Sequence, residues 1–330
     1  MGEPLPERLG KTSGEMVSSC SMSEAFQKVI GLKIDVDTYN GMKNGVPRIL
    51  SLLNRFGIKA SFFVPMGKDH TGWTAKRVFT RRGFLKKASR VGVIETYGIR
   101  TLMYGLLLPG PEIARKNALT IRQIVTEGHE AGIHGYDHVN WHDHVKEWGE
   151  AKTTEVLDRA CSVYEDILGR KARSFAAPGW MINAHALRFF ENNGFLYSSD
   201  TRGSSPFLPV MGSDQFNIPQ IPTTLPTLDE VVGLAGHEPL SLTRYFLDSL
   251  SEGLNILTVH TELEGKHWTG FLEAFIIQTL DQGFTYGRLM DIAQACREGE
   301  AIPRCNIFYG HVEGRAGEVS CQSKKVAGSK

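Results

Sequence analysis

The chain has few of the features that mark secreted or membrane-spanning proteins. Its 330 residues include only five cysteines, which are scattered and form no Cys-x-x-Cys pair. This usage excludes a disulfide scaffold and is typical of a reducing compartment. No stretch reaches the roughly 18–20 consecutive apolar residues that a membrane-spanning helix needs, and the first residues lack the apolar core of a signal peptide. The sequence therefore predicts a cytoplasmic protein without a transmembrane anchor.

A surplus of either charge is also absent. The 37 Lys and Arg residues nearly balance the 36 Asp and Glu residues, which leaves a net charge of +1. Composition therefore predicts no nucleic-acid partner, and any basic surface must be local. The hydrophobic content of 41% is that of a globular protein with a proper core.

Strand-like and helix-like segments alternate along most of the chain. Amphipathic helices such as VPRILSLLNRFG separate the segments that we predict as strands: KVIGLKIDV, IKASFFVP, EAGIHG, RSFAAP, FLYSS, NIPQIP and LNILTVH. This order predicts an α/β fold of parallel strands wrapped by helices, either a barrel or a doubly wound sheet. The polar residues 1–27 and 310–330 are predicted to be disordered, so the predicted domain spans residues 28–300.

Residues 67–111 interrupt this alternation. From Trp73 to Ile94 the segment has no acidic side chain and seven basic ones: Lys76, Arg77, Arg81, Arg82, Lys86, Lys87 and Arg90. The apolar residues that follow fall on one helical face: Ile99, Leu102, Met103, Leu106 and Leu107. The pattern predicts a basic amphipathic helical insertion. Its alternative is a solvated basic face with the apolar stripe packed on the barrel.

Aspartates close the first predicted strand. Asp35 and Asp37 are two residues apart, so on a strand their side chains share a face. Two carboxylates so close need a cation or a proton between them, although helix caps or turn residues would give the same pattern. The carboxyl ends of barrel strands build the active-site face, which favours a functional interpretation.

Histidines follow two other predicted strands. The stretch EGHEAGIHGYDHVNWHDH contains five of the eleven histidines. His134 and His138 could grip one ion if a helical turn follows the strand, and a structural pair is an equal alternative. The same holds for His260, which ends LNILTVH. Taken together, two histidines and one carboxylate leave positions open on a divalent metal, and the remaining carboxylate and histidine supply a base and an acid.

In their order, the motifs DVD, GHEAGIHGYDH, RSFAAPGW and LTVH resemble those of the polysaccharide-deacetylase (NodB-like) superfamily. The resemblance covers residues 29–297 and implies a distorted β/α barrel with one divalent metal ion, which could be zinc, cobalt, manganese or nickel. It implies Asp37, His134 and His138 as metal ligands. It also implies Asp35 as the catalytic base and His260 as the catalytic acid.

The chain departs from the family pattern in three places. Val36 separates the two aspartates, the stretch AAPGW has no arginine, and no tryptophan follows Asp200. The resemblance still implies an oxyanion-binding backbone N–H near Pro178, Gly179 and Trp180, with Asp200 close by. His142 and His144 lie outside the pattern and are predicted as loop residues, and His129 is predicted to begin the third strand.

Four further stretches narrow the resemblance: IDVDTYNGMKNGVPRILSLLNRFGIKASFFVPMG, FAAPGW, YSSDTRG and HTELEG. They are similar to bacterial family members that deformylate undecaprenyl-phosphate-linked 4-formamido-4-deoxy-L-arabinose. The similarity implies release of formate on the route to aminoarabinose-modified lipid A and to antimicrobial-peptide resistance. It also implies peripheral contact of the basic insertion with the anionic inner leaflet of the cytoplasmic membrane, where each surface cation contributes about 1 kcal/mol.

Three alternatives share parts of the pattern. An N-deacetylase of another glycan would use the same catalytic residues, but the missing signal peptide and the basic insertion count against it. A hydrolase of small cyclic amides would need no membrane insertion. A non-catalytic metal- or sugar-binding barrel would have no use for both Asp35 and His260 beside the metal ligands.

Overall fold

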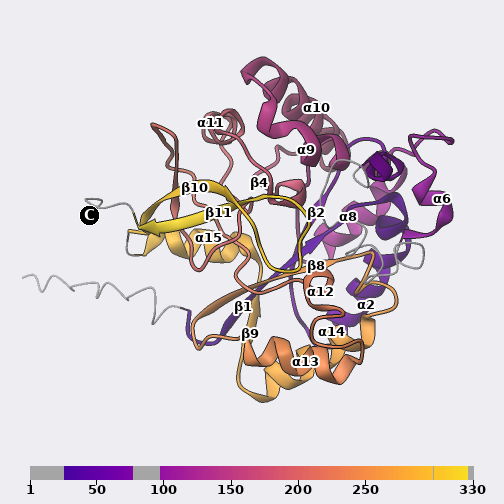
Figure 1. Ribbon diagram of the computed structural model, residues 1–330, viewed down its shortest axis with the longest axis vertical. Helices are drawn as coiled ribbons and strands as arrows, with labels where there is room; N and C mark the ends of the chain where they lie inside the picture. Colours follow the sequence, from indigo (N-terminus) through magenta and orange to yellow (C-terminus); the bar gives the residue numbers. More distant parts are fainter. Residues whose placement is uncertain (1–25, 77–96, 300, 326–330) are drawn as a thin grey trace, which may run out of the picture.

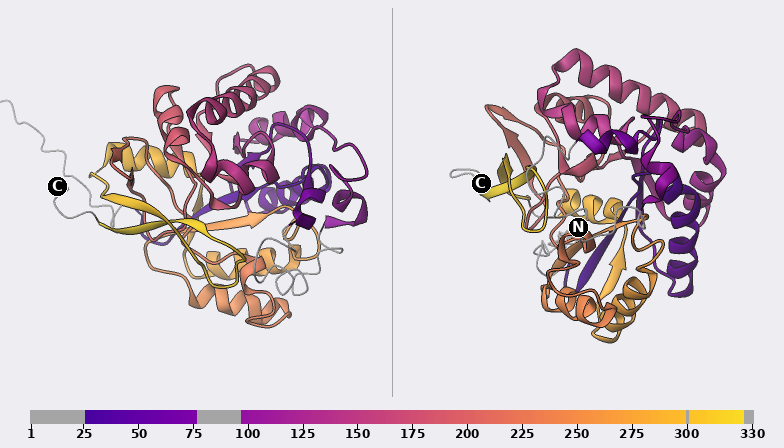
Figure 2. Two further views of the ribbon diagram at one scale, coloured as in Figure 1. Left: turned by 45° about the horizontal axis from the view of Figure 1, so that its top comes forward. Right: turned by 45° about the vertical axis from the view of Figure 1, so that its right-hand side comes forward.

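The computed structural model describes residues 26–76, 97–299 and 301–325. Its centre is a seven-stranded parallel sheet with the path β5-β4-β3-β2-β1-β8, and β9 pairs with β1 beside that path. The strands curl into an incomplete barrel with helices around it (Figures 1 and 2), which confirms the predicted distorted β/α barrel. The strands are β1 Val29–Asp35, β2 Ser61–Val64, β3 Glu130–Ile133, β4 Ser174–Phe175, β5 Tyr197–Ser198, β8 Leu254–His260 and β9 Thr285–Gly287.

The first strand lies at the centre of this sheet. β1 pairs with β8 along its whole length, with β2 over its last three residues and with β9 over its first three. All its residues after Val29 are buried, as expected for a parallel strand covered on both faces. A side chain on β1 therefore faces either the barrel interior or the helices. The last residues of β1 lie in the middle of the carboxyl edge of the sheet.

The predicted strand NIPQIP is wrong, because two of its residues are prolines, which have no N–H to donate to a ladder. The segment and the residues after it instead bridge the edge strands β5 and β8. The N–H of Ile221 donates to Ser198 O at 2.9 Å, and the N–H of Leu225 donates to Ile256 O at 3.2 Å. These bonds span the gap in the barrel where strand pairing stops.

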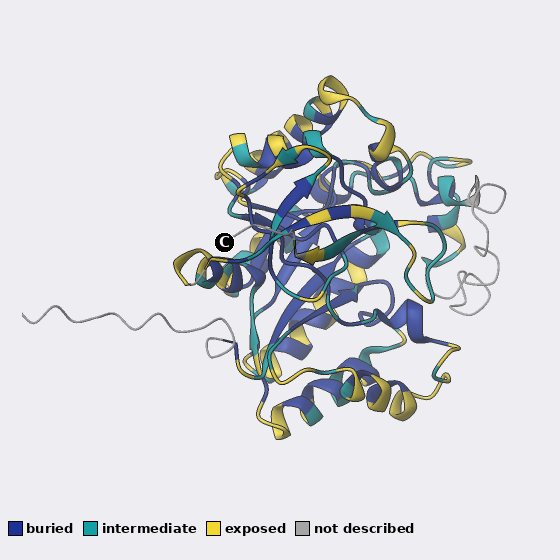
Figure 3. Cartoon of the chain, turned by 60° about the vertical axis from the view of Figure 1, so that its left-hand side comes forward, coloured by how far each residue is buried: buried dark blue, intermediate teal, exposed yellow. Residues whose placement is uncertain are grey.

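Helices cover the outside of the barrel with one face inward, as Figure 3 shows by the burial of each residue. In α10 (Glu150–Leu168) the buried residues recur every three or four positions, and the helix ends at Gly169 with φ 66°. No helix in the described ranges is both long and apolar enough to cross a membrane. The other helices of at least seven residues are α2 Val46–Arg55, α8 Ala118–Thr126, α9 His138–His144, α11 Ala184–Asn192, α13 Pro239–Asp248, α14 Thr269–Asp281 and α15 Leu289–Glu298.

The prediction of a disordered tail after residue 310 is wrong for most of that segment. β10 (Arg304–Gly310) and β11 (Val319–Lys325) form an antiparallel hairpin, and β10 also pairs in parallel with β6 (Leu208–Met211). β6 in turn pairs with β7 (Asp214–Gln215), which completes a second, four-stranded sheet. Apolar side chains such as Ile307 and Val319 are buried and anchor the hairpin. The other predicted disordered segment, residues 1–27, lies almost wholly outside the described residues.

Among the described residues, the apolar stripe from Ile99 to Leu107 is less helical than predicted. α6 (Ile99–Leu102) is a single turn, after which the chain turns at Gly105 with φ 84°. Leu106 and Leu107 are left 50% and 77% exposed. Lys76 ends the short 3-10 helix η2 (Thr71–Lys76). The remaining basic residues of the run lie outside the described residues: Arg77, Arg81, Arg82, Lys86, Lys87 and Arg90.

Candidate metal centre and its surroundings

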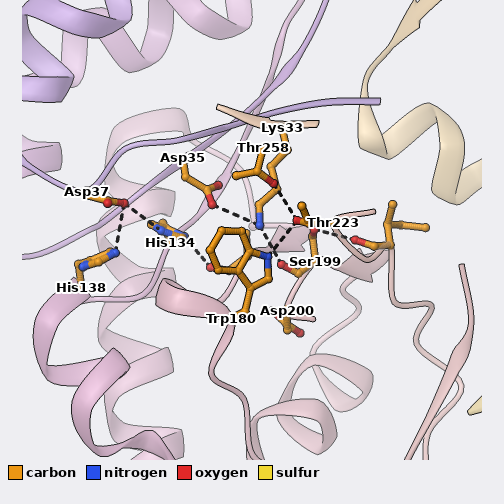
Figure 4. A network of polar contacts seen from close by, with 12 residues as sticks. Lys33, Asp35, Asp37, His134, His138, Trp180, Ser199, Asp200, Thr223 and Thr258 are labelled. Atoms are coloured by element: carbon orange, nitrogen blue, oxygen red, sulfur yellow. Dashed lines mark hydrogen bonds and ion pairs between the residues drawn. The ribbon is translucent and has the colours of Figure 1, made fainter. Parts of the chain in front are cut away.

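The predicted site residues gather at the carboxyl end of the barrel (Figure 4). Asp35 is the last residue of β1 and His260 the last of β8, and the two are partners in register. Asp37 follows β1 by two residues, and His134 follows β3 directly. The carboxyl ends of parallel strands share one edge of the sheet, so residues distant in sequence meet there.

Asp37, His134 and His138 form a compact group. Asp37 Oδ1 lies 3.1 Å from His138 Nε2 and 3.5 Å from His134 Nε2. One potential ligand atom from each residue lies within 4.8 Å of the other two. Although burial acts to raise the pKa of Asp37, the neighbouring His138 and His134 hold it well below its ordinary value.

The tautomer of His134 shows that this group fits a cation. His134 Nδ1 lies 2.8 Å from Ala176 O, and a carbonyl oxygen only accepts, so Nδ1 carries the proton. In the neutral ring, Nε2 then presents a lone pair toward the carboxylate of Asp37. Two such acceptors repel unless a cation or a proton lies between them. An Asp-His-His donor set suits a divalent metal and leaves coordination positions open.

A turn followed by a helix start brings His138 to this group. A helical turn directly after the strand was the condition under which the sequence let both histidines bind one ion, but the chain first passes through Gly135 with φ 75°. Helix α9 then begins at His138, and the side chain of Asp137 caps it by accepting from the N–H of Asn140 at 3.0 Å. The cap fixes the first turn of the helix and thereby the imidazole of His138.

Glu262 holds the loop that carries Asp37. Its Oε1 accepts from the N–H of Asp37 at 3.2 Å and from the N–H and hydroxyl of Thr38 at 2.9 and 2.8 Å. A Cβ at Gly41 would lie 1.9 Å from this oxygen, so only glycine permits the approach. Burial, followed by the charge of Asp37, raises the pKa of Glu262 to about 7. The sequence prediction missed this residue, although HTELEG belonged to the family match.

Asp35 is 2% exposed and has a cation beside it. Its Oδ2 lies 3.2 Å from Lys33 Nζ, and Lys33 itself is fully buried. No hydrogen bond from the described residues reaches Asp35 Oδ1. The sequence prediction also missed Lys33, although a lone lysine inside an apolar strand is a signal, because lysine is rarely buried without a partner.

His260 is held through its backbone. Its N–H donates to Glu264 Oε2 at 3.0 Å, while its ring Nδ1 is buried and receives no hydrogen bond from the described residues. Burial raises the pKa of Glu264 to about 8. The indole of Trp180 meets the imidazole edge to face, with ring centroids 6.0 Å apart.

The turn from Pro178 to Trp180 carries the N–H groups predicted to bind an oxyanion. Gly179 and Trp180 both have left-handed backbone angles, with φ 61° and φ 55°. The N–H of Trp180 already donates to Ala177 O at 3.0 Å, which leaves that of Gly179 as the candidate. A Cβ at Gly179 would lie 2.6 Å from the ring of His142, which requires glycine there.

Trp180 is clamped on several sides despite its strained backbone. Its Nε1 donates to Thr223 Oγ1 at 2.9 Å. The guanidinium of Arg315 lies 4.4 Å and that of Arg202 5.2 Å from its ring centroid. Both arginines also pair with Glu230, at 3.4 and 2.5 Å. The sequence prediction missed Arg315, because it assigned this part of the chain to a disordered tail.

Asp200, which the family resemblance implied to lie close to the turn at Trp180, is fully buried (Figure 4). Gln220 Nε2 donates to its Oδ2 at 2.9 Å, and its Oδ1 receives no hydrogen bond from the described residues. Burial raises the pKa of Asp200 to about 6.

The other histidines of the motif lie outside the metal group. His129 immediately precedes β3, close to its predicted place, and accepts from the N–H of Ala60 at 3.1 Å. The prediction that His142 and His144 are loop residues is wrong. Both belong to α9, where His142 is buried against Gly179 and His144 is the exposed last residue.

Comparison with known proteins agrees with this geometry. The family model described as Polysaccharide deacetylase matches residues 24–198. A relative from Shewanella sediminis (strain HAW-EB3) is 33% identical over 306 residues, which cover 92% of this chain and 98% of the relative. It is named "Probable 4-deoxy-4-formamido-L-arabinose-phosphoundecaprenol deformylase ArnD". A relative of the same name from Wigglesworthia glossinidia brevipalpis is 31% identical over 294 residues, which cover 87% of this chain and 99% of the relative.

A solved structure shows the same fold. A crystal structure assigned to a polysaccharide deacetylase from Mycobacterium smegmatis superposes with a TM-score of 0.57 at 20% sequence identity, covering 86% of this chain and 94% of that one. The family model matches more than half of the chain, and the match to each relative covers nearly all of that relative's length. The chain belongs to the polysaccharide deacetylase family.

Proposed function

We propose that the protein removes the formyl group from undecaprenyl-phosphate-linked 4-formamido-4-deoxy-L-arabinose and releases formate. One observation carries this proposal: the chain matches 98% of the length of a relative named for that reaction. The gathering of Asp37, His134 and His138 beside Asp35 and His260 supports it, because amide hydrolysis needs an electrophile, a base and an acid. The product would be a lipid-linked aminosugar for lipid A modification and antimicrobial-peptide resistance.

Asp37, His134 and His138 would hold one divalent ion. When bound, such an ion lowers the pKa of a water molecule and polarises the amide carbonyl. Two imidazoles and one carboxylate suit zinc, cobalt, manganese or nickel. Glu262 keeps the loop of Asp37 in place through three hydrogen bonds, so the ligand geometry is set before the ion arrives.

The remaining residues would move the protons. Asp35 Oδ1 takes a proton from the attacking water while the water oxygen bonds to the formyl carbon. The N–H of Gly179 donates to the carbonyl oxygen as negative charge develops there. His260 then protonates the amine nitrogen, the C–N bond breaks, and formate leaves.

Formate release tests the proposed reaction directly. We expect the protein, freed of metal by a chelator and reloaded with manganese, zinc, cobalt or nickel, to release formate from the lipid-linked formamido sugar. The chelated protein should release none. The acetamido analogue of the same sugar is the control, because an N-deacetylase of another glycan would release acetate from it. Acetate from the analogue together with no formate from the formamido sugar would contradict the proposal.

We propose that the substrate is met at the cytoplasmic face of the inner membrane. The segment carrying the exposed Leu106 and Leu107 packs near the site: Asn40 Nδ2 donates to Tyr97 O at 3.3 Å, and Tyr39 N–H donates to Asp69 Oδ2 at 2.8 Å. Exposed leucines that follow a basic run in the sequence suit the headgroup region of an anionic leaflet. The sugar would then reach the site while the polyprenyl chain stays in the membrane.

Vesicle sedimentation tests this membrane proposal. Attraction between the basic run and anionic lipid is screened over roughly 8 Å at physiological ionic strength, so binding should weaken as salt rises. Changing Arg81, Arg82, Lys86 and Lys87 together to Gln should release the protein even at low salt. The variant should still hydrolyse a short, water-soluble formamido-sugar analogue. Wild-type binding by the variant would assign the basic run to an ordinary solvated surface.

A further inference from the structure

Lys33 is the most deeply buried cation near the site. It lies in the middle of β1 and has no solvent exposure, although burying an ammonium group without compensation is costly. We propose that Lys33 is a positioning residue that fixes the carboxylate of Asp35 so that one oxygen faces the reacting atoms. This inference rests on the proposed function, because the proposed reaction is what assigns Asp35 as the base.

Strand geometry brings the two side chains together. Residues two apart on a strand share a face, so Lys33 and Asp35 point into the same side of the barrel. The Nζ of Lys33 lies 3.2 Å from Asp35 Oδ2 and donates to Ser199 O at 3.1 Å. It also lies 5.2 Å from the ring centroid of Trp180 and 5.9 Å from that of Phe63 (Figure 4). Two aromatic faces and a carbonyl thus hold the ammonium group in one place.

This arrangement makes the two oxygens of Asp35 unequal. Oδ2 is tied to Lys33, while Oδ1 is buried and receives no hydrogen bond from the described residues. A carboxylate held by one oxygen can rotate little, so Oδ1 keeps one direction. The pairing of Asp35 with His260 in register sets the height of that oxygen on the carboxyl edge. Orientation of this kind matters because a misplacement of about 1 Å can cost on the order of 100-fold in rate.

The neighbouring carboxylate does not compete for this role. Asp200 is also buried nearby, but Gln220 Nε2 donates to its Oδ2 at 2.9 Å and Gln220 Oε1 accepts from its backbone N–H at 3.1 Å. Among the described residues, Lys33 forms an ion pair with Asp35 and none with Asp200. Lys33 therefore acts on the reaction through Asp35.

A double-mutant cycle in turnover tests this inference. We expect Lys33→Met to lower kcat on the order of 100-fold with little change in KM and with full metal content, and Lys33→Arg to restore most of the loss. Combining Lys33→Met with Asp35→Asn should cost no more than Asp35→Asn alone, because both changes remove the same oriented base. Lys28→Met, at the opposite end of β1 and partly exposed, is the matched control and should turn over normally.

A second cycle measures unfolding free energy and needs no turnover. Lys33→Met should destabilise the fold, because it leaves Asp35 as an unpaired buried charge, and adding Asp35→Asn should recover part of the loss. If the unfolding cycle shows this coupling but the wild type releases no formate, the proposed function is refuted and Lys33 has a structural role only. Additive losses in kcat, or equal activity of Lys33→Met and wild type, would overturn the positioning role while the proposed function stands.

Discussion

Buried carboxylates lie at both ends of the same barrel, and they differ in how fully they are hydrogen-bonded. At the amino end, Glu130 begins β3 and accepts from the hydroxyls of Ser61, Ser174 and Tyr197 and from the N–H of Met290. These donors come from the first residues of β2, β4 and β5 and from α15. The network therefore ties neighbouring strands together and leaves neither oxygen of Glu130 unsatisfied.

At the carboxyl end, three carboxylates each keep one buried oxygen that receives no hydrogen bond from the described residues. These are the Oδ1 atoms of Asp35, Asp37 and Asp200. An unsatisfied buried acceptor costs about 1–3 kcal/mol. Burial alone thus does not separate structural from functional carboxylates. Hydrogen bonding of both oxygens does, because a carboxylate with an unsatisfied oxygen can still bind a proton, an ion or a substrate.

The largest effect is expected from removing a metal ligand. His138→Ala should lose both bound metal and activity, because one carboxylate and one imidazole hold a divalent ion poorly. His144→Ala is the matched control, since His144 is exposed at the end of the same helix. Elemental analysis and turnover check both variants. Full metal content in His138→Ala would show that the ligand assignment is wrong.

Removing a proton-transfer group should have the next largest effect. Asp35→Asn and His260→Ala should each lower kcat on the order of 100-fold or more. Metal content and fold should survive, because neither residue belongs to the ligand group. Turnover rates and elemental analysis of the purified variants give the answer. Near-normal turnover in either variant would remove that residue from the mechanism.

At the amino end of the barrel, replacing a buried carboxylate by its amide should affect stability instead of turnover. Glu130→Gln turns an amide nitrogen toward groups that donate, at a cost of about 1–3 kcal/mol in the free energy of unfolding. Denaturant unfolding measures this loss, and turnover per folded molecule should equal that of the wild type. Lost turnover at unchanged stability would mean that the two ends of the barrel are not independent.

A further effect is expected in the pH dependence of stability. Burial raises the pKa of Glu264 to about 8, against an ordinary value of 4.5. Between these values the folded state keeps a proton that the unfolded state has released, so stability falls as pH rises through this window. Glu264→Gln should flatten that slope, because glutamine keeps an acceptor for the His260 N–H and does not titrate. Denaturation midpoints at about pH 5 and pH 8 compare the two proteins, and equal slopes would exclude the effect.

The fold class and the ligand group could be predicted because they depend on local patterns and motifs. Alternating apolar strands and amphipathic helices predicted an α/β fold of parallel strands, and the family resemblance of short motifs implied the distorted barrel and the group of Asp37, His134 and His138. Both inferences use only short stretches of sequence. They hold because parallel strands bring their carboxyl ends to one edge.

Long-range contacts limited the prediction elsewhere. The partner of Asp35 is Lys33 because both lie on one strand face, yet the anchors of Lys33 include Ser199 and Trp180 from distant parts of the chain. The C-terminal hairpin looked disordered because its residues are polar, and only pairing with β6 reveals its buried face. His142 gave no signal of its packing against Gly179, since that contact joins helix α9 to the distant turn from Pro178 to Trp180.

The contact of Arg315 with Trp180 forms late in biosynthesis, because Arg315 lies near the end of the chain. A nascent chain folds from its amino end as it leaves the ribosome, at about 5–20 residues per second. The strands bearing the metal ligands therefore emerge well before the hairpin that supplies Arg315, whose guanidinium lies 4.4 Å from the indole of Trp180. A transcript cut short before β10 would encode every metal ligand and His260, but its product would lack this clamp on the strained turn at Gly179 and Trp180.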